Sequence, residues 1–136
     1  MKHLSKLSSL LFCLVATLPP AATAQPSPAA EREARAAFVN LIDAAKQRDT
    51  SQFRSLIASP DLKAMEEMEK GKPGFVAMMM EMMADTEPSK YAAEVKPAGV
   101  TFRRQVVTQT ADSKGTQSTT FTMVREGNAW KFGEHP

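Results

Sequence analysis

The sequence predicts an α+β protein, in which N-terminal helices are followed by an antiparallel sheet of about four strands. Between residues 31 and 84, apolar side chains recur at steps of three and four residues, the period of helices that bury one face. After Lys90, apolar and polar side chains alternate, which is the two-residue period of strands. The clearest of these segments is residues 116–133 (TQSTTFTMVREGNAWKFG), which predicts two strands joined by a tight turn.

This C-terminal hairpin is expected to supply the sheet's part of the core. Gly127 and Asn128 tolerate a positive φ at low cost, so they can form the turn. The apolar residues on either side of the turn alternate with polar ones and therefore face the same way. They are Phe121, Met123, Trp130 and Phe132.

The first residues have the pattern of a secretory signal peptide. Lys2 and Lys6 form a basic start, and residues 7–18 are apolar but too short to span a bilayer. Ala24 ends a small-x-small cleavage pattern, so we predict a periplasmic or secreted protein without a stable membrane span; an uncleaved anchor is the alternative. The predicted parts are a signal peptide (1–24), a flexible leader (25–30) and one domain (31–136).

Cleavage would change both the thiol content and the charge of the chain. Cys13 is the one cysteine and lies inside the signal, so the mature protein would have no thiol and no disulfide. The chain has 17 Lys and Arg and 15 Asp and Glu. Loss of Lys2 and Lys6 would leave equal numbers, so the basic balance belongs to the signal and gives no support for nucleic-acid binding.

Four helices are expected before the strands. Asp49 is a good N-cap for a short second helix, with Gln52 three residues later as in a capping box. Ser59 is expected to cap the third helix, with Pro60 in the first helical position. The other predicted helices cover about residues 30–47 and 75–84, and Gly71 ends the third.

The strands are expected to form an antiparallel meander. Residues 91–96 and 100–110 read as the first two strands, and residues 111–115 (ADSKG) as the turn before the hairpin. The alternation slips at Arg103 and Arg104, which predicts a β-bulge in the second strand.

At this point the chain resembles a small secreted member of the NTF2-like (cystatin-like) superfamily. The matching features are AAFVNLIDAAKQRDTSQFRSLI (36–57), similar to the family's long first helix and short second one, and the ending TTFTMVREGNAWKF. The resemblance covers nearly all of the mature chain and rests on packing features rather than on chemistry. It implies a curved sheet wrapped around a long helix, in a cone with room for a pocket. Because such domains often dimerise through their sheets, it also implies an alternative interface for a homodimer.

Enzymes of this superfamily place an Asp, a His or a Tyr inside the cone as acid or base. The candidates here are Asp43, expected to face outward, Asp49, expected to cap a helix, Tyr91, and the near-terminal His135. No catalytic motif of the family matches residue by residue. We therefore predict no catalytic residue and no cofactor, and keep an enzyme with an unrecognised pocket as a third hypothesis.

Methionine is the more specific chemical signal, because eight methionines would remain after cleavage. Thioether sulfur is a soft ligand for Cu(I) and Ag(I), and it also fills irregular cores and adaptable surfaces. The sequence therefore supports a metal-binding hypothesis and a structural one. The candidate metal ligands are Met65, Met68, Met79 and Met83.

The helix at residues 75–84 (FVAMMMEMMA) is apolar over a wider arc than one core-facing stripe needs. We therefore expect Val76, Met80 or Met83 to be exposed, in a surface for a protein partner, a second copy or an apolar ligand. The first hypothesis is a non-catalytic periplasmic NTF2-like domain that binds an apolar small molecule or a protein; the metal site is the alternative. The proposed ligand or partner surface comprises Val76, Met79, Met80, Met83 and Trp130.

Overall fold

A computed structural model of the chain describes residues 28–134. The predicted signal peptide, Cys13, the cleavage site after Ala24, most of the leader, and His135 lie outside the described residues. The elements are α1 (Pro28–Gln47), α2 (Thr50–Ser55), α3 (Ser59–Gly71), α4 (Phe75–Ala84), a 3₁₀ turn η1 (Pro88–Lys90), β1 (Ala92–Lys96), β2 (Gly99–Gln109), β3 (Lys114–Glu126) and β4 (Ala129–Phe132). Helices followed by an antiparallel meander confirm the predicted α+β plan. Within the described part of the chain, every helix is too short or too polar to cross a membrane.

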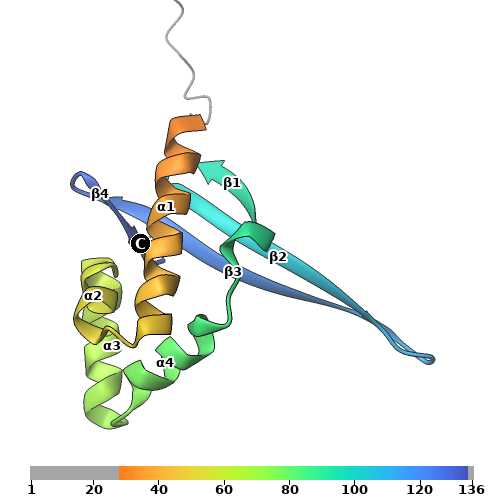
Figure 1. Cartoon of the computed structure of the whole chain (residues 1–136), viewed down its shortest axis with the longest axis horizontal. Helices are drawn as coiled ribbons and strands as arrows, with labels where there is room; N and C mark the ends of the chain where they lie inside the picture. Colours follow the sequence, from red (N-terminus) through yellow and green to blue (C-terminus); the bar gives the residue numbers. More distant parts are fainter. Residues whose placement is uncertain (1–27, 135–136) are drawn as a thin grey trace, which may run out of the picture.

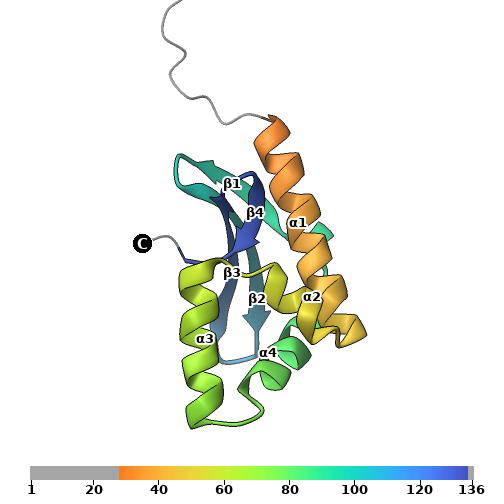
Figure 2. The same ribbon diagram turned by 90° about the vertical axis from the view of Figure 1, so that its left-hand side faces the viewer.

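The four strands form one open sheet in the order β1-β2-β3-β4, and α1 crosses its inner face (Figure 1). The view turned by 90° shows α3 and α2 beside the short strand β4 (Figure 2). The outer edge of β4 is covered, because the Phe132 N–H donates to the Leu56 carbonyl and the Ala58 N–H to the Phe132 carbonyl, each at 2.8 Å. The link between α2 and α3 thus closes this edge of the sheet.

The core is built on Phe38, which is fully buried in the middle of α1. Its ring lies 5.0 Å from those of Phe102 and Phe121 and 5.5 Å from that of Tyr91, measured between centroids. The helical stripe predicted from the sequence therefore meets the inward face of the strands, as the two periodicities require. The buried residues of α1 are Ala34, Phe38, Leu41, Ile42, Ala44 and Ala45.

Helix capping agrees with the sequence at α2 and differs at α3. Asp49 caps α2, since its Oδ1 accepts the Gln52 N–H at 3.0 Å. The N-cap of α3 is Ala58, so the prediction that Ser59 caps this helix is wrong. Ser59 instead donates its N–H and its hydroxyl to the Glu126 carboxylate, at 2.7 and 2.6 Å. These bonds join the start of α3 to the end of β3, and they lower the pKa of Glu126.

The predicted β-bulge is also absent. Pairing between β2 and β3 runs without interruption from Gly99 opposite Val124 to Gln109 opposite Lys114. The apparent slip at Arg103 and Arg104 marks the point where the two strands leave the core, because residues 105–120 are all exposed. Beyond that point no other described helix or strand covers either face of β2 and β3. The alternation of apolar residues therefore no longer indicates which side chains are buried.

A carboxylate from α3 holds the start of α4. Glu69 accepts the Val76 N–H at 2.9 Å and the Gly74 N–H at 3.1 Å, and Gly74 has a φ of 90° that favours glycine. These backbone hydrogen bonds, Val76 first, lower the pKa of Glu69 below its ordinary value of 4.5.

We expect this contact to make stability depend on pH. Because the folded pKa of Glu69 is the lower one, the unfolded chain takes up the proton first as the pH falls. The stabilisation is therefore complete above 4.5 and is lost as the pH falls from 4.5 through the folded pKa. In urea unfolding at a series of pH values, Glu69→Gln should be less stable than the parent near neutrality, and the difference should shrink in acid. Parallel stability curves for the two proteins would contradict the assignment.

Candidate functional site

The best candidate site is a pocket between α4 and the inner face of the sheet, which we call the α4–sheet pocket. It has a volume of about 430 Å³. The end of α4 forms one wall, and residues of β2, β3 and β4 form the other. Its lining residues are Met79, Met82, Met83, Asp85, Thr86, Tyr91, Arg104, Thr119, Thr120, Phe121 and Phe132.

The buried stripe of α4 decides which methionines reach this pocket. Val76, Met80 and Met83 are buried, so the expectation that they are exposed is wrong. They follow the helical spacing of four and three residues and form the stripe of a helix that packs against α1. The exposed large apolar side chains of α4 are instead Met78 and Met82, and 72% of Met82 is exposed.

The pocket combines an apolar floor with a polar rim. Phe121 is buried and its ring lies 6.0 Å from that of Phe132 and 5.5 Å from that of Tyr91, so aromatic faces and edges form one side. Met83 is buried opposite them, and Met79 is half-buried. Thr86, Asp85 and Arg104 add a hydroxyl, a carboxylate and a guanidinium. Such a floor with a few polar groups is typical of small-molecule sites.

Trp130 was predicted to belong to the same ligand or partner surface, but its contacts lie elsewhere. Its Nε1 donates to the Glu33 carboxylate on α1 at 3.2 Å, and Arg125 Nη2 donates to the same oxygen at 3.0 Å. The Trp130 bond, followed by the Arg125 bond, lowers the pKa of Glu33. Trp130 thus joins β4 to α1 and is not among the residues that line the α4–sheet pocket.

The four candidate metal ligands are divided between the α4–sheet pocket and helix α3. Met79 and Met83 line the pocket, whereas Met65 is buried on α3 and Met68 is exposed there, and neither lines it. The metal hypothesis stays a prediction. Of the four proposed sulfurs, the pocket contains those of Met79 and Met83, and the third methionine in its lining is Met82. Among residues 28–134, no group of three or more His, Cys, Asp and Glu side chains is placed to hold a metal ion.

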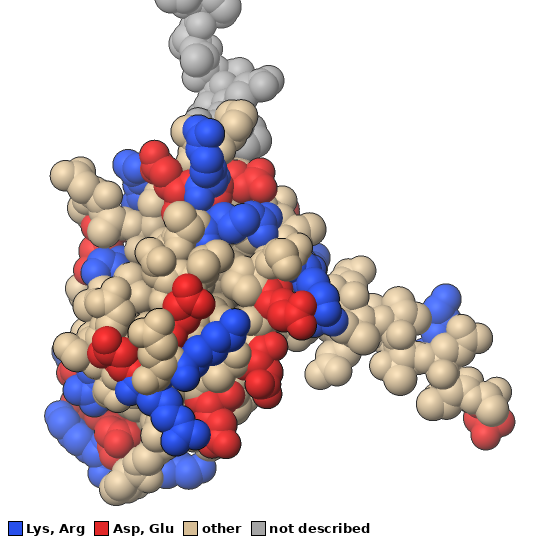
Figure 3. All heavy atoms as spheres, in the orientation of Figure 1, with Lys and Arg blue, Asp and Glu red and all other residues tan. Residues whose placement is uncertain are grey.

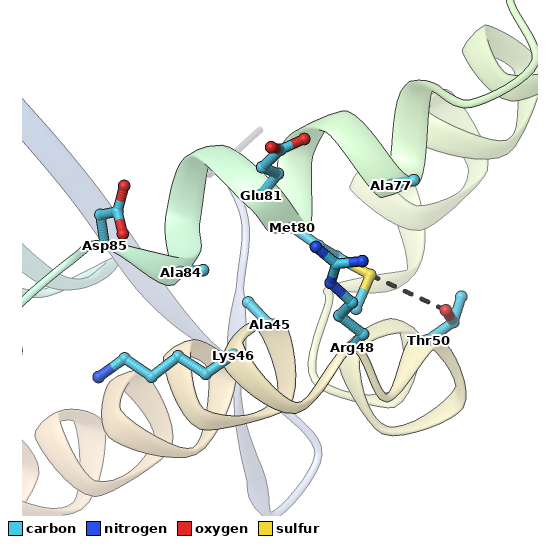
Figure 4. Close-up of a pocket in the computed structure, with 9 residues that line it drawn as sticks. All are labelled: Ala45, Lys46, Arg48, Thr50, Ala77, Met80, Glu81, Ala84 and Asp85. Atoms are coloured by element: carbon cyan, nitrogen blue, oxygen red, sulfur yellow. Dashed lines mark hydrogen bonds between the residues drawn. The ribbon is translucent and has the colours of Figure 1, made fainter.

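A second, more polar pocket of about 400 Å³ lies between the end of α1 and α4 (Figure 4). Lys46 and Arg48 line it from the α1 side, and Glu81 and Asp85 from α4. The close-up shows the hydrogen bond from the Thr50 hydroxyl to the Met80 sulfur, at 3.9 Å, on its floor. Two cations and two carboxylates balance, so this pocket has no net charge to attract an ion.

The carboxylates weighed for catalysis do not come together. Asp49 is occupied as the cap of α2, and Asp43 is exposed on α1. Tyr91, by contrast, is buried and lines the α4–sheet pocket. Alternation along the strand had placed Phe121 and Phe132 on the inward face, but no local signal showed that Thr86 and Arg104 would meet them.

Comparisons with family models, curated proteins and solved structures found no match to this chain. The fold and the pocket therefore define only a class, an α+β domain in which a helix covers part of the inner face of an open four-stranded sheet.

Proposed function

We propose that this chain is a non-catalytic periplasmic or secreted domain of NTF2-like architecture, which binds an apolar small molecule in the α4–sheet pocket. The observation that carries the proposal is the pocket itself, with an apolar floor of Met79, Met83, Phe121 and Phe132. Its volume of about 430 Å³ lies within the usual range for ligand sites. Methionine side chains adapt to ligands of different shape, which suits a binding site without strict geometry.

The glutamates with lowered pKa values give no support for catalysis in the α4–sheet pocket. General acid–base chemistry needs a group whose pKa is tuned and which can reach a substrate. The glutamates with lowered pKa values are held by structural hydrogen bonds, and none of them lines the α4–sheet pocket. They are Glu33, Glu69, Glu87 and Glu126.

Filling the pocket should prevent binding. Thr119 lines the pocket from β3 and lies on an exposed stretch of strand, so a larger side chain can be placed there without altering the core. We expect Thr119→Trp to weaken binding of the apolar fluorescent probe N-phenyl-1-naphthylamine by about tenfold or more, which corresponds to about 1.4 kcal/mol. The measurement is a fluorescence titration of the probe with the purified full chain.

Ser118→Trp provides the matched control. Ser118 is the preceding residue of β3, is equally exposed and lies outside the pocket lining. This variant adds the same indole to the opposite face of the ribbon, so its affinity for the probe should equal that of the parent. Equal affinities for all three proteins, or no binding by the parent, would refute the pocket as the ligand site.

A further inference from the structure

The β2–β3 hairpin extends well beyond the body as a two-stranded arm, which we define as residues 105–120. Figure 1 shows the arm projecting away from the helices, and all of its residues are exposed. Inside the body, β1 pairs with β2 as far as Arg103, and β4 pairs with β3 from Met123 onward. In the described chain, no third strand pairs with β2 or β3 along the arm. Both edges of the arm therefore present backbone N–H and C=O groups that are open for pairing.

The arm has few of the features that normally protect an open edge. It contains no proline and no bulge, and its only charged residues are Asp112 and Lys114 near the tip. Figure 3 shows it as a largely uncharged extension of a body that is rich in charge. Val106 and Val107, on opposite faces, are 42% and 55% exposed. A lone two-stranded ribbon is only marginally stable in water, so these features favour a further strand beside it.

The charges of the arm favour a second copy of this chain as that partner. Arg103 and Arg104 lie where β2 leaves the body, and neither forms a salt bridge among residues 28–134, although Arg104 interacts electrostatically with Glu87 at longer range. Asp112 lies at the tip. In antiparallel pairing of two identical strands, the tip of each arm reaches the root of the other. Asp112 lies in the turn beyond the end of β2 at Gln109, so the turn of each copy brings Asp112 next to Arg104 of the other copy, once on each side of the two-fold axis.

The match between Arg104 and Asp112 also indicates the register in which the two β2 strands pair. Thr108 lies midway between Arg104 and Asp112 in the sequence, so it would lie on the two-fold axis. Each antiparallel residue advances the strand by about 3.4 Å, and both arms have the same length, so the two contacts can form together. Lys114 lies on β3, the strand farther from this edge, and does not repel the arginines of the other copy directly.

We propose that two copies of this chain associate through their β2 edges, in a dimer whose arms form one continuous four-stranded antiparallel ribbon. The surface involved is residues 104–112. It is distinct from the α4–sheet pocket, apart from Arg104, and does not depend on the proposed ligand.

Sedimentation velocity of the full chain over a range of concentrations tests the proposal. The parent should sediment as a dimer that dissociates on dilution. The double variant Val106→Lys, Val107→Lys places two positive charges on each arm, so the dimer interface would hold four. Their repulsion should raise the dissociation constant of the dimer about tenfold or more. The control is Val39→Lys with Met78→Lys, which adds the same charge at exposed apolar positions of α1 and α4 and should leave the dimer intact.

Hydrogen exchange gives a second readout. In the dimer, backbone N–H groups of residues 104–109 that point away from β3 become protected, and dilution should remove that protection. A parent that is monomeric at every concentration would overturn the proposal. The partner of the β2 edge would then be a strand from another protein. A dimer that survives the arm lysines would overturn it as well, because the interface would then lie elsewhere.

Discussion

Phe38→Ala is expected to lower the free energy of unfolding by about 3–5 kcal/mol, the usual cost of removing a buried phenylalanine ring. Phe38 is fully buried, and its ring joins α1 to Phe102 on β2 and to Phe121 on β3. The truncation leaves a cavity at the contact between the two layers, where neither layer can collapse without moving the other. Urea unfolding, followed by far-ultraviolet circular dichroism, measures the loss.

The adjacent residue of α1 is the control. Val39 is exposed on the outer face of the helix, so Val39→Ala should change the free energy of unfolding by no more than about 0.5 kcal/mol. Comparable losses at both positions would mean that α1 does not present this face to the sheet. Failure of Phe38→Ala to fold at all is consistent with the prediction, and Phe38→Leu then measures a smaller loss at the same position.

Met80→Ala is expected to cost about 2–5 kcal/mol, because only 3% of Met80 is exposed and it belongs to the core cluster of the protein. Met82→Ala should change stability by less than about 0.5 kcal/mol, since 72% of its surface is already in water. The two substitutions are the same and lie on the same helix, so helix propensity cancels in the comparison. The difference between their urea-unfolding free energies measures burial directly.

Equal losses of unfolding free energy at Met80 and Met82 would show that α4 does not bury the face that it buries in the structure. This comparison also decides between the exposed surface expected from the sequence and the buried stripe found in the fold. In the structure, Met80 belongs to that stripe together with Val76 and Met83.

The α4–sheet pocket and the arm both lie at the place where β2 and β3 leave the body. Arg104 contributes to the pocket lining and begins the exposed edge, so a dimer paired at that edge would place the second copy near the pocket mouth. Binding of N-phenyl-1-naphthylamine and dimerisation can be measured separately, because the Thr119→Trp and arm-lysine variants alter different residues.

The sequence alone was sufficient for features that depend on neighbouring residues. Helical spacing predicted the buried stripe of α1, the Asp49 cap follows from side-chain chemistry, and the turn at Gly127 needs a positive φ, which is 62° in the structure. Alternation also placed Phe121 and Met123 on the inward face. These signals are local, since each depends on the geometry of a single helix, turn or strand.

Tertiary packing alone decided the remaining features. Helix α4 is apolar around most of its circumference, so only its contact with α1 determines that Met80 is buried while Met82 is exposed. Likewise, the Thr- and Val-rich composition of β2 and β3 suits a strand whether or not a body covers it, so the exposed arm could not be distinguished from a core strand. The pocket arises because α4 and β3, distant in sequence, meet across the sheet, and contacts of that kind leave no periodic signal in either segment.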